Sequence, residues 1–121
     1  MTRATLVYGG SAGQRENRIA SDRNLLDRTA VIAEGLPASD SPLESLTAAV
    51  PVELFRIAPG CPCCIGNLTM RVTLNRILKR APGQLYISLA SNMHLAAIRD
   101  FLQDPQYQAR LTFTTDLDCN A

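Results

Sequence analysis

Tryptophan is absent from the 121-residue sequence, and three Tyr and three Phe residues are its whole supply of aromatic side chains. Proteins that bind single-stranded nucleic acid by stacking its bases need more aromatic surface than this. An excess of one charge is also missing, because twelve Lys and Arg residues stand against eleven Asp and Glu residues. A dedicated nucleic-acid binder is strongly basic. Both deficits argue against a nucleic-acid partner.

Long hydrophobic runs are lacking as well, and no apolar segment approaches the roughly 18 residues of a membrane span. The N-terminal residues lead into a short apolar stretch without the cleavage pattern of an export signal. We therefore expect no membrane partner and predict a cytoplasmic, reducing location. The hydrophobic content of 46% and the charged content of 19% are typical of a globular protein. The length predicts a single domain, residues 1–121.

Cysteines that are well separated in the sequence, and could form a disulfide framework, are missing. Three of the four cysteines, Cys61, Cys63 and Cys64, lie within four positions, and the fourth is Cys119. Cysteines this close together cannot all be bridged to one another. In a reducing compartment, crowded thiols indicate metal ligands or redox groups.

The chain alternates between strand-like and helix-like patterns. Strands are predicted at residues 4–8, 29–33, 51–57, 84–89 and 110–114, and helices at about 14–28, 43–50, 65–80 and 92–103. Strands that alternate with helices pair in parallel through right-handed crossovers. We therefore predict an α/β fold, a three-layer sandwich around a mostly parallel five-stranded sheet. Ligands of such sheets bind beyond the carboxyl ends of the strands.

A glycine-rich loop, residues 9–13, follows the first predicted strand, at the place where a phosphate-binding P-loop would lie. A P-loop needs a second glycine, a lysine and a hydroxyl at positions that Gln14, Arg15 and Glu16 occupy here. Nucleotide hydrolysis is therefore not expected. Two interpretations remain: the helix N-terminus attracts an anion with the help of Arg15, or the loop is a purely structural turn.

The cysteine cluster follows a predicted strand and precedes a predicted helix, and it permits three interpretations. In the first, two or three thiolates bind a soft metal ion, zinc or copper(I). In the second, Cys61 and Cys64 form a redox-active C-x-x-C pair. In the third, the cysteines are buried and inert. For a metal site, further ligands would come from a partner or from three residues of this chain, Glu34, His94 and Cys119.

The segment 57–68, Ile-Ala-Pro-Gly-Cys-Pro-Cys-Cys-Ile-Gly-Asn-Leu, resembles the Gly-Cys-x-Cys-Cys signature of the CobW-type (CobW/HypB/UreG-like) metal-chaperone GTPases. Looser similarities extend along the chain. Residues 5–10 are similar to the family's first strand and the start of its P-loop, and residues 30–35 are similar to the strand before its switch loop. Residues 85–91 correspond to the strand that carries its Glu-Thr-Ser-Gly motif. Residues 94–104 and 111–116 resemble its next helix and its next strand.

The resemblance implies a single degenerate GTPase-like domain with a truncated P-loop-NTPase-like topology. It implies that Cys61, Cys63 and Cys64 are metal thiolates and that Glu34 is a switch-loop carboxylate. GTP binding and hydrolysis are not implied, because the P-loop Lys and Ser/Thr are missing and the sequence ends before the family's guanine-reading Asn-Lys-x-Asp strand.

We therefore predict a non-enzymatic metal-binding protein whose cofactor is zinc, with no bound nucleotide. Its expected partner is another protein, such as one that receives the metal, and self-association stays open. The alternative is a catalytically inactive GTPase-like interaction module with structural cysteines. A thiol-redox protein is the third hypothesis.

Overall fold

The structure is a computed structural model, and it describes residues 2–22, 28–34, 52–57, 65–89 and 95–119. The elements, in chain order, are β1 (Thr2–Tyr8), α1 (Ala12–Asp22), β2 (Thr29–Glu34), β3 (Val52–Ile57), α3 (Ile65–Lys79), β4 (Gln84–Leu89), α4 (Leu95–Leu102), α5 (Pro105–Gln108), β5 (Leu111–Phe113) and β6 (Leu117–Asp118).

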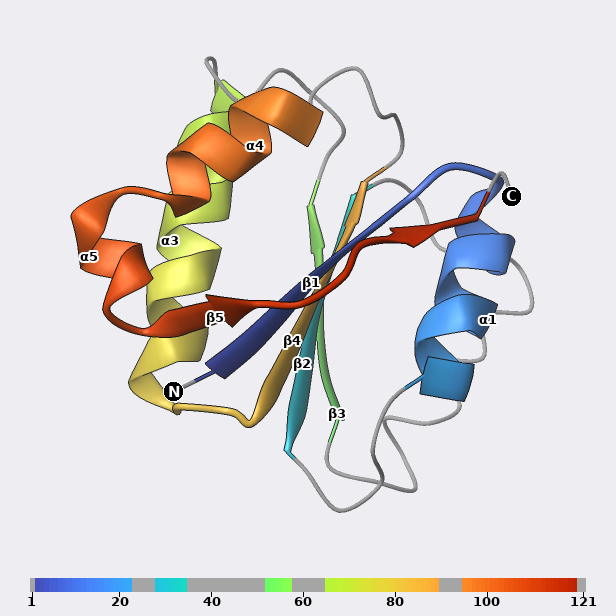
Figure 1. Cartoon of the computed structure of the whole chain (residues 1–121), viewed down its shortest axis with the longest axis horizontal. Coiled ribbons are helices and arrows are strands. Elements are labelled where there is room, and N and C mark those ends of the chain that lie inside the picture. Colours follow the sequence, from blue (N-terminus) through green and yellow to red (C-terminus); the bar gives the residue numbers. More distant parts are fainter. Residues whose placement is uncertain (1, 23–27, 35–51, 58–64, 90–94, 120–121) are drawn as a thin grey trace.

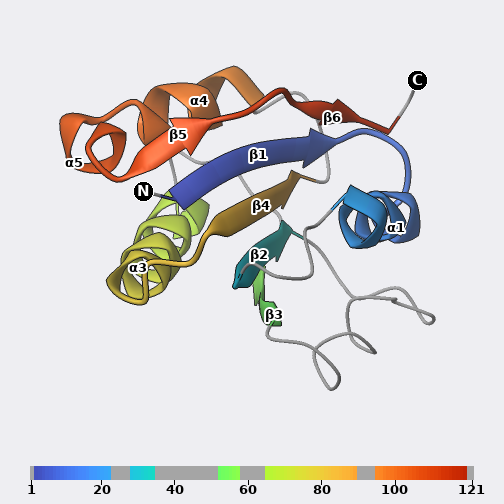
Figure 2. The same cartoon turned by 60° about the horizontal axis from the view of Figure 1, so that its bottom comes forward.

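The strands form one parallel sheet in the order β3-β2-β4-β1-β5, and the short strand β6 also pairs with β1. Helix α1 covers one face of the sheet, and α3, α4 and α5 cover the other (Figures 1 and 2). The predicted three-layer α/β fold is confirmed, and the arrangement is consistent with a truncated P-loop-like α/β sandwich. The described sheet has six strands instead of the five predicted.

The alternation of side chains along each strand explains the two hydrophobic layers. In β1, Ala4 and Leu6 join the core beneath α3, α4 and α5, whereas Val7 joins the core beneath α1. The central strand β4 is buried at all six positions, as expected for a parallel strand with helices on both faces.

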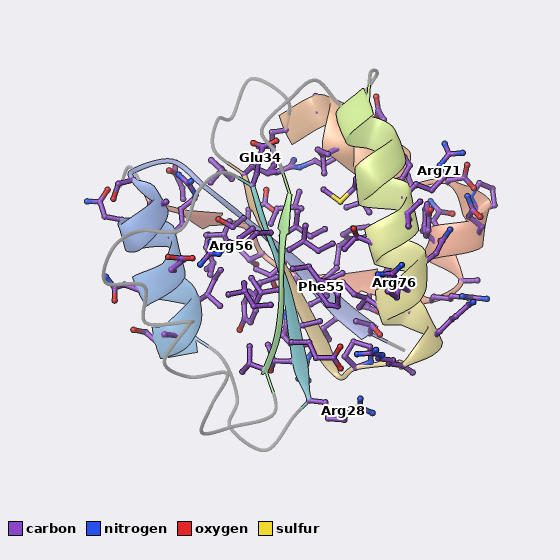
Figure 3. The ribbon with its side chains drawn as sticks, turned by 180° about the vertical axis from the view of Figure 1, so that it is seen from behind. Arg28, Glu34, Phe55, Arg56, Arg71 and Arg76 are labelled. Carbon is purple, nitrogen blue, oxygen red and sulfur yellow. The ribbon has the colours of Figure 1, made fainter. Side chains whose placement is uncertain are left out.

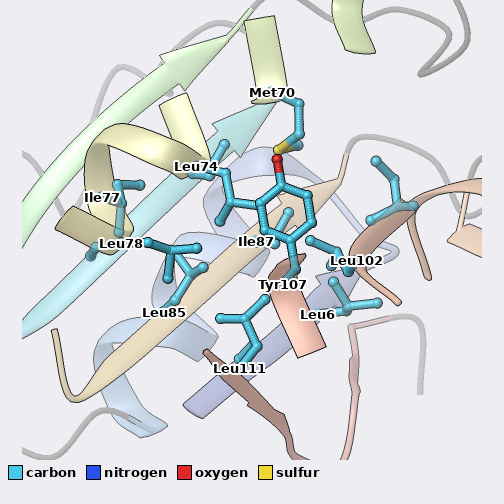
Figure 4. Close-up of a cluster of buried hydrophobic side chains, with 14 of the residues drawn as sticks. Leu6, Met70, Leu74, Ile77, Leu78, Leu85, Ile87, Leu102, Tyr107 and Leu111 are labelled. Carbon is cyan, nitrogen blue, oxygen red and sulfur yellow. The ribbon is translucent and has the colours of Figure 1, made fainter. Parts of the chain in front are cut away.

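The larger core lies between the sheet and α3, α4 and α5 (Figure 4). Helix α3 supplies four side chains that recur at helical spacing, Met70, Leu74, Ile77 and Leu78. Tyr107 of α5 is 1% exposed, and its hydroxyl donates to Oδ1 of Asn75 at 3.2 Å.

Several boundaries differ from the sequence prediction. Helix α1 begins at Ala12 instead of about Gln14, and its predicted continuation through 23–27 lies outside the described residues. The predicted helix at 43–50 and the first residues of the predicted helix at 92–103 also lie outside them.

The four-residue helix α5 was not predicted. The Asp104 carboxylate accepts a hydrogen bond from the backbone N–H of Gln106 at 3.1 Å, and Pro105 occupies the first helical turn. Both are helix-starting signals.

Candidate functional site

The carboxyl ends of the strands meet at one edge of the sheet because all strands are parallel. The residues that end them there are Tyr8, Glu34, Ile57, Leu89 and Asp118. This is the edge at which the sequence predicts a ligand site, and the glycine loop follows β1 there (Figure 1).

The glycine loop turns from β1 into α1 through two residues with positive φ, Gly9 at 82° and Gly10 at 61°. The helix then begins with a reciprocal capping box. The backbone N–H of Gln14 donates to Ser11 Oγ at 3.1 Å, and the backbone N–H of Ser11 donates to Gln14 Oε1 at 2.7 Å. These two N–H groups, which a phosphate cradle would present to its ligand, are thus satisfied within the loop.

The guanidinium of Arg15 is turned inward, and the residue is only 3% exposed. Its Nε donates to Ser88 Oγ of β4 at 3.0 Å, and its Nη1 donates to the carbonyls of Gly9 at 3.3 Å and Gly10 at 3.0 Å. Arg15 stands at the P-loop lysine position, yet it binds its own chain. This corrects the expectation that Arg15 helps the helix N-terminus to attract an anion.

Burial lowers the pKa of Arg15, while the neighbouring Cys119, Glu34 and Glu16 act in the opposite direction. The guanidinium is thus a cation held by three oxygen acceptors and stabilised by nearby acidic groups. Its physical role is to tie the glycine loop to β4, because its hydrogen bonds reach both segments.

Glu16, at the P-loop hydroxyl position, is 1% exposed. Its Oε1 accepts from Nη2 of Arg56 on β3 at 2.7 Å, and its Oε2 has no hydrogen-bond partner. Figure 3 shows Arg56 on the side of β3 that faces α1. Glu16 therefore joins α1 to the outer strand of the sheet.

Glu34, the predicted oxygen ligand, is the last residue of β2 and is partly exposed. The β2–β3 register places its Cα opposite that of Ile57, the last residue of β3 (Figure 3). Cys61, Cys63 and Cys64 follow Ile57 in the sequence and precede Ile65, where α3 begins, but they lie outside the described residues. The structure therefore places Glu34 beside the strand end from which the cysteine segment departs.

Cys119 is half-buried at the end of β6, and its backbone N–H donates to the carbonyl of Tyr8 at 2.8 Å. Burial raises the pKa of the Cys119 thiol, and the nearby Arg15 and Arg18 reduce that effect. Three strands of the sheet lie between β6 and β3, namely β1, β4 and β2. Four strand spacings amount to about 19 Å, so Cys119 belongs to the glycine loop and not to the end of β3.

One candidate ligand, His94, and one carboxylate beyond β5, Asp116, remain to be placed. His94 lies outside the described residues. Asp116 forms an ion pair with Arg99 of α4, which is a structural contact. Among the described residues, no three His, Cys, Asp or Glu side chains come together as a metal site.

The capping box is a site feature that the sequence analysis missed, although Ser11-x-x-Gln14 is a readable helix-start signal. The burial of Arg15 had no such signal. Its partner Ser88 is 73 positions away in the chain, and only the fold brings the two together.

Comparisons with protein-family models, with curated proteins and with solved structures found no match. The resemblance to the CobW-type family therefore stays a prediction that rests on the residues themselves. In the part of the chain that the structure describes, no helix has the length and apolar character needed to cross a bilayer.

Proposed function

We propose that this protein is a non-catalytic metal-binding protein, in which Cys61, Cys63 and Cys64 bind a zinc ion and Glu34 supplies an oxygen ligand. The observation that supports it is the pairing of Glu34 with Ile57 across β2 and β3. Glu34 is the only predicted ligand among the described residues at that side of the sheet. It thus lies next to the strand that leads to the cysteines.

The chemistry of this donor set fits zinc. Three thiolates and one carboxylate oxygen complete the tetrahedral coordination that zinc adopts in protein sites. Helix α3 begins at Ile65, directly after Cys64, and the positive end of a helix dipole favours the thiolate form over the thiol. Zinc would act there as a bound cargo or a structural ion, and no step of catalysis is required of it.

The absence of catalysis in this proposal follows from the glycine loop. The capping box uses the N–H groups of Ser11 and Gln14 that would otherwise face a nucleotide phosphate, and the Arg15 guanidinium is bound to the carbonyls of its own loop. A nucleotide would have to displace a buried guanidinium from three acceptors before it could bind. We therefore infer that the chain resembles a GTPase domain that has kept its cysteine motif and lost its phosphate site.

The test is a competition titration of the fully reduced protein with zinc against a chromophoric chelator. We expect one zinc per chain, with two or three thiols protected from alkylation. The C63S/C64S variant should lose zinc binding, and Glu34→Gln should weaken it by about tenfold or more, because a neutral amide is a poorer ligand than a carboxylate.

Cys119→Ser is the matched control, since it removes a thiol far from the end of β3 and should leave zinc affinity unchanged. Failure of the wild-type protein to bind zinc, with thiols that alkylate slowly when reduced, would contradict the proposal. That result would favour the inactive GTPase-like interaction module. A reversible Cys61–Cys64 disulfide, detected by mass spectrometry after mild oxidation, would favour the redox protein instead.

A further inference from the structure

The cations on α3 and around the amino end of the sheet fall into two groups. Arg28 and Arg80 both form ion pairs with Glu53 of β3, so their charges are compensated. The other group consists of exposed side chains on α3 and just after α5, namely Arg71, Arg76, Lys79 and Arg110. Within the described residues, none of these four forms an ion pair with a carboxylate. We call these four residues the basic face.

The outer surface of α3 has no opposing charge, because no Asp or Glu occurs anywhere in Ile65–Lys79. Val72 lies on the same side of the helix as Arg76 and Lys79, since residues three, four and seven positions apart share a helix face. It is 49% exposed and is one of two large hydrophobic side chains that the described surface leaves open. An apolar side chain thus lies within an uncompensated positive field. Figure 3 shows Arg71 on the side of α3 away from the sheet, with Arg76 further along the same helix.

A groove of about 380 Å³ connects α3 to α5 and contributes further donors. Lys79 and Arg110 line it, together with the polar side chains of Asn75, Gln106 and Tyr107. The Tyr107 hydroxyl already donates to Asn75 Oδ1, which leaves the Asn75 amide N–H groups free to donate. No acidic side chain lines the groove. The nearest acid along the chain, Asp104, caps the first turn of α5.

We propose that the basic face is a docking surface for an acidic segment of a partner protein, with carboxylates on Arg76, Lys79 and Arg110 and an apolar side chain on Val72. Charge complementarity carries the assignment, because four exposed cations without acidic partners are best compensated by an acidic segment. Lys79 and Arg110 lie shortly before the amino ends of β4 and β5, and Arg76 lies one turn before Lys79. The cations used here therefore lie away from Glu34, and the inference is independent of the proposed metal site (Figure 3).

An acidic peptide fits the basic face better than a nucleic acid does. Bases stack on exposed aromatic rings, but Tyr107 is buried and Phe101 is covered by Arg71, whose guanidinium carbon lies 5.6 Å from the ring centre. The net charge of the whole chain is only +1, which gives little long-range attraction for a phosphate backbone. An exposed valine on the same helix face as Arg76 and Lys79 instead provides an apolar contact of the kind found inside protein interfaces.

Fluorescence anisotropy with the full chain and a labelled synthetic peptide tests the proposal. The probe is a short glutamate-rich peptide with one central leucine, and its control is the same peptide with Gln in place of every Glu. We expect the acidic peptide alone to bind, with an affinity that falls as salt rises because exposed charges are screened. Lys79→Glu and Arg76→Glu should each weaken binding by about fivefold or more.

The matched control is Arg18→Glu, which makes the same change of charge at an exposed position on α1, across the sheet. It should change the affinity by less than about twofold, because the peptide does not contact α1. Val72→Ser should weaken binding while leaving its salt dependence intact. Circular dichroism confirms that each variant is folded.

The proposal is overturned by any of three results. The first is no binding of the acidic peptide at low salt. The second is an equal loss of affinity in Arg18→Glu, which would show a response to net charge alone. The third is tighter binding of an oligothymidylate than of the acidic peptide, which would identify the basic face as a nucleic-acid surface.

Discussion

At the scale of single residues, Arg15 decides what the glycine loop can do. An arginine at this position has the charge to bind phosphate, but its three hydrogen bonds go to Gly9, Gly10 and Ser88. A buried guanidinium is tolerated only when its donors are satisfied. The same interactions that stabilise the cation therefore remove it from any role toward a ligand.

Replacement of this guanidinium tests that view. Arg15→Gln should lower the free energy of unfolding by about 2–4 kcal/mol, because the shorter amide leaves buried acceptors on the loop and on β4 without donors. Arg18→Gln, an exposed change of the same kind on the same helix, should cost less than about 0.5 kcal/mol. Urea denaturation of both variants gives the comparison. Equal stabilities would contradict the anchoring role of Arg15.

The reactivity of Cys119 follows from its surroundings. Burial raises the pKa of its thiol, so at neutral pH less of it is the reactive thiolate than in an unfolded chain. In a variant with Cys61, Cys63 and Cys64 replaced by Ser, iodoacetamide should therefore alkylate Cys119 more slowly in the folded protein than in urea. As the pH is increased, the alkylation rate of the folded protein should begin to rise at a higher pH than the alkylation rate of the unfolded chain.

Arg18 lowers the pKa of that thiol, so removal of the Arg18 charge should raise this pKa. Arg18→Gln should slow alkylation of Cys119 further in the folded state and leave the rate in urea unchanged. An unchanged alkylation rate in folded Arg18→Gln would contradict the effect of Arg18 on the thiol.

At the scale of elements, the turn between β1 and α1 depends on glycine. At Gly10, φ is +61°, and an added Cβ would lie 2.4 Å from Gln14 Oε1 and 3.2 Å from the carbonyl oxygen of Cys119. Both the left-handed backbone and the contact disfavour any other residue. Gly10→Ala should therefore lower the free energy of unfolding by about 1–3 kcal/mol.

Gly13, three residues after Gly10, offers a matched comparison. It lies within α1 and does not have positive φ. Gly13→Ala should stabilise the protein by up to about 1 kcal/mol, since alanine has a higher helix propensity. Thermal denaturation of the two variants should give shifts of opposite sign, and a loss of stability in both would show that the turn is not the cause.

The elements that the sequence predicts best are those with clear local signals. Strand β4 begins and ends as predicted, at Gln84 and Leu89, because Pro82 and Gly83 precede a mostly apolar run. Strand β6 has no such signal. Its two residues are a strand only because Val7 and Tyr8 of β1 lie beside them, so the pairing depends on the tertiary structure.

The candidate site divides in the same way. The position of Glu34 at the carboxyl edge follows from the parallel strand order and could be predicted from the pattern of strands. Two interactions could not be predicted in this way, the bond from Arg15 to Ser88 and the pairing of Glu16 with Arg56. Each joins segments at least 40 positions apart in the chain. A motif comparison identifies which P-loop residues are missing, but the fold determines where their replacements point.

At the scale of the whole molecule, the two ends of the sheet carry different proposed roles. The carboxyl edge holds the glycine loop, Glu34 and the departure point of the cysteine segment. The basic face extends along α3 to the amino end, and no described carboxylate forms an ion pair with its cations. The molecule would thus bind a metal ion at one end and an acidic protein segment at the other, with the parallel sheet between them.

The zinc K-edge X-ray absorption spectrum of the zinc-loaded, reduced protein tests the central claim most directly. We predict a first shell with two or three sulfur atoms at about 2.3 Å, completed by oxygen or nitrogen at about 2.0 Å. The Cys119→Ser variant should give the same spectrum. A shell of oxygen and nitrogen alone, or a sulfur count that falls in Cys119→Ser, would contradict a zinc site built from Cys61, Cys63, Cys64 and Glu34.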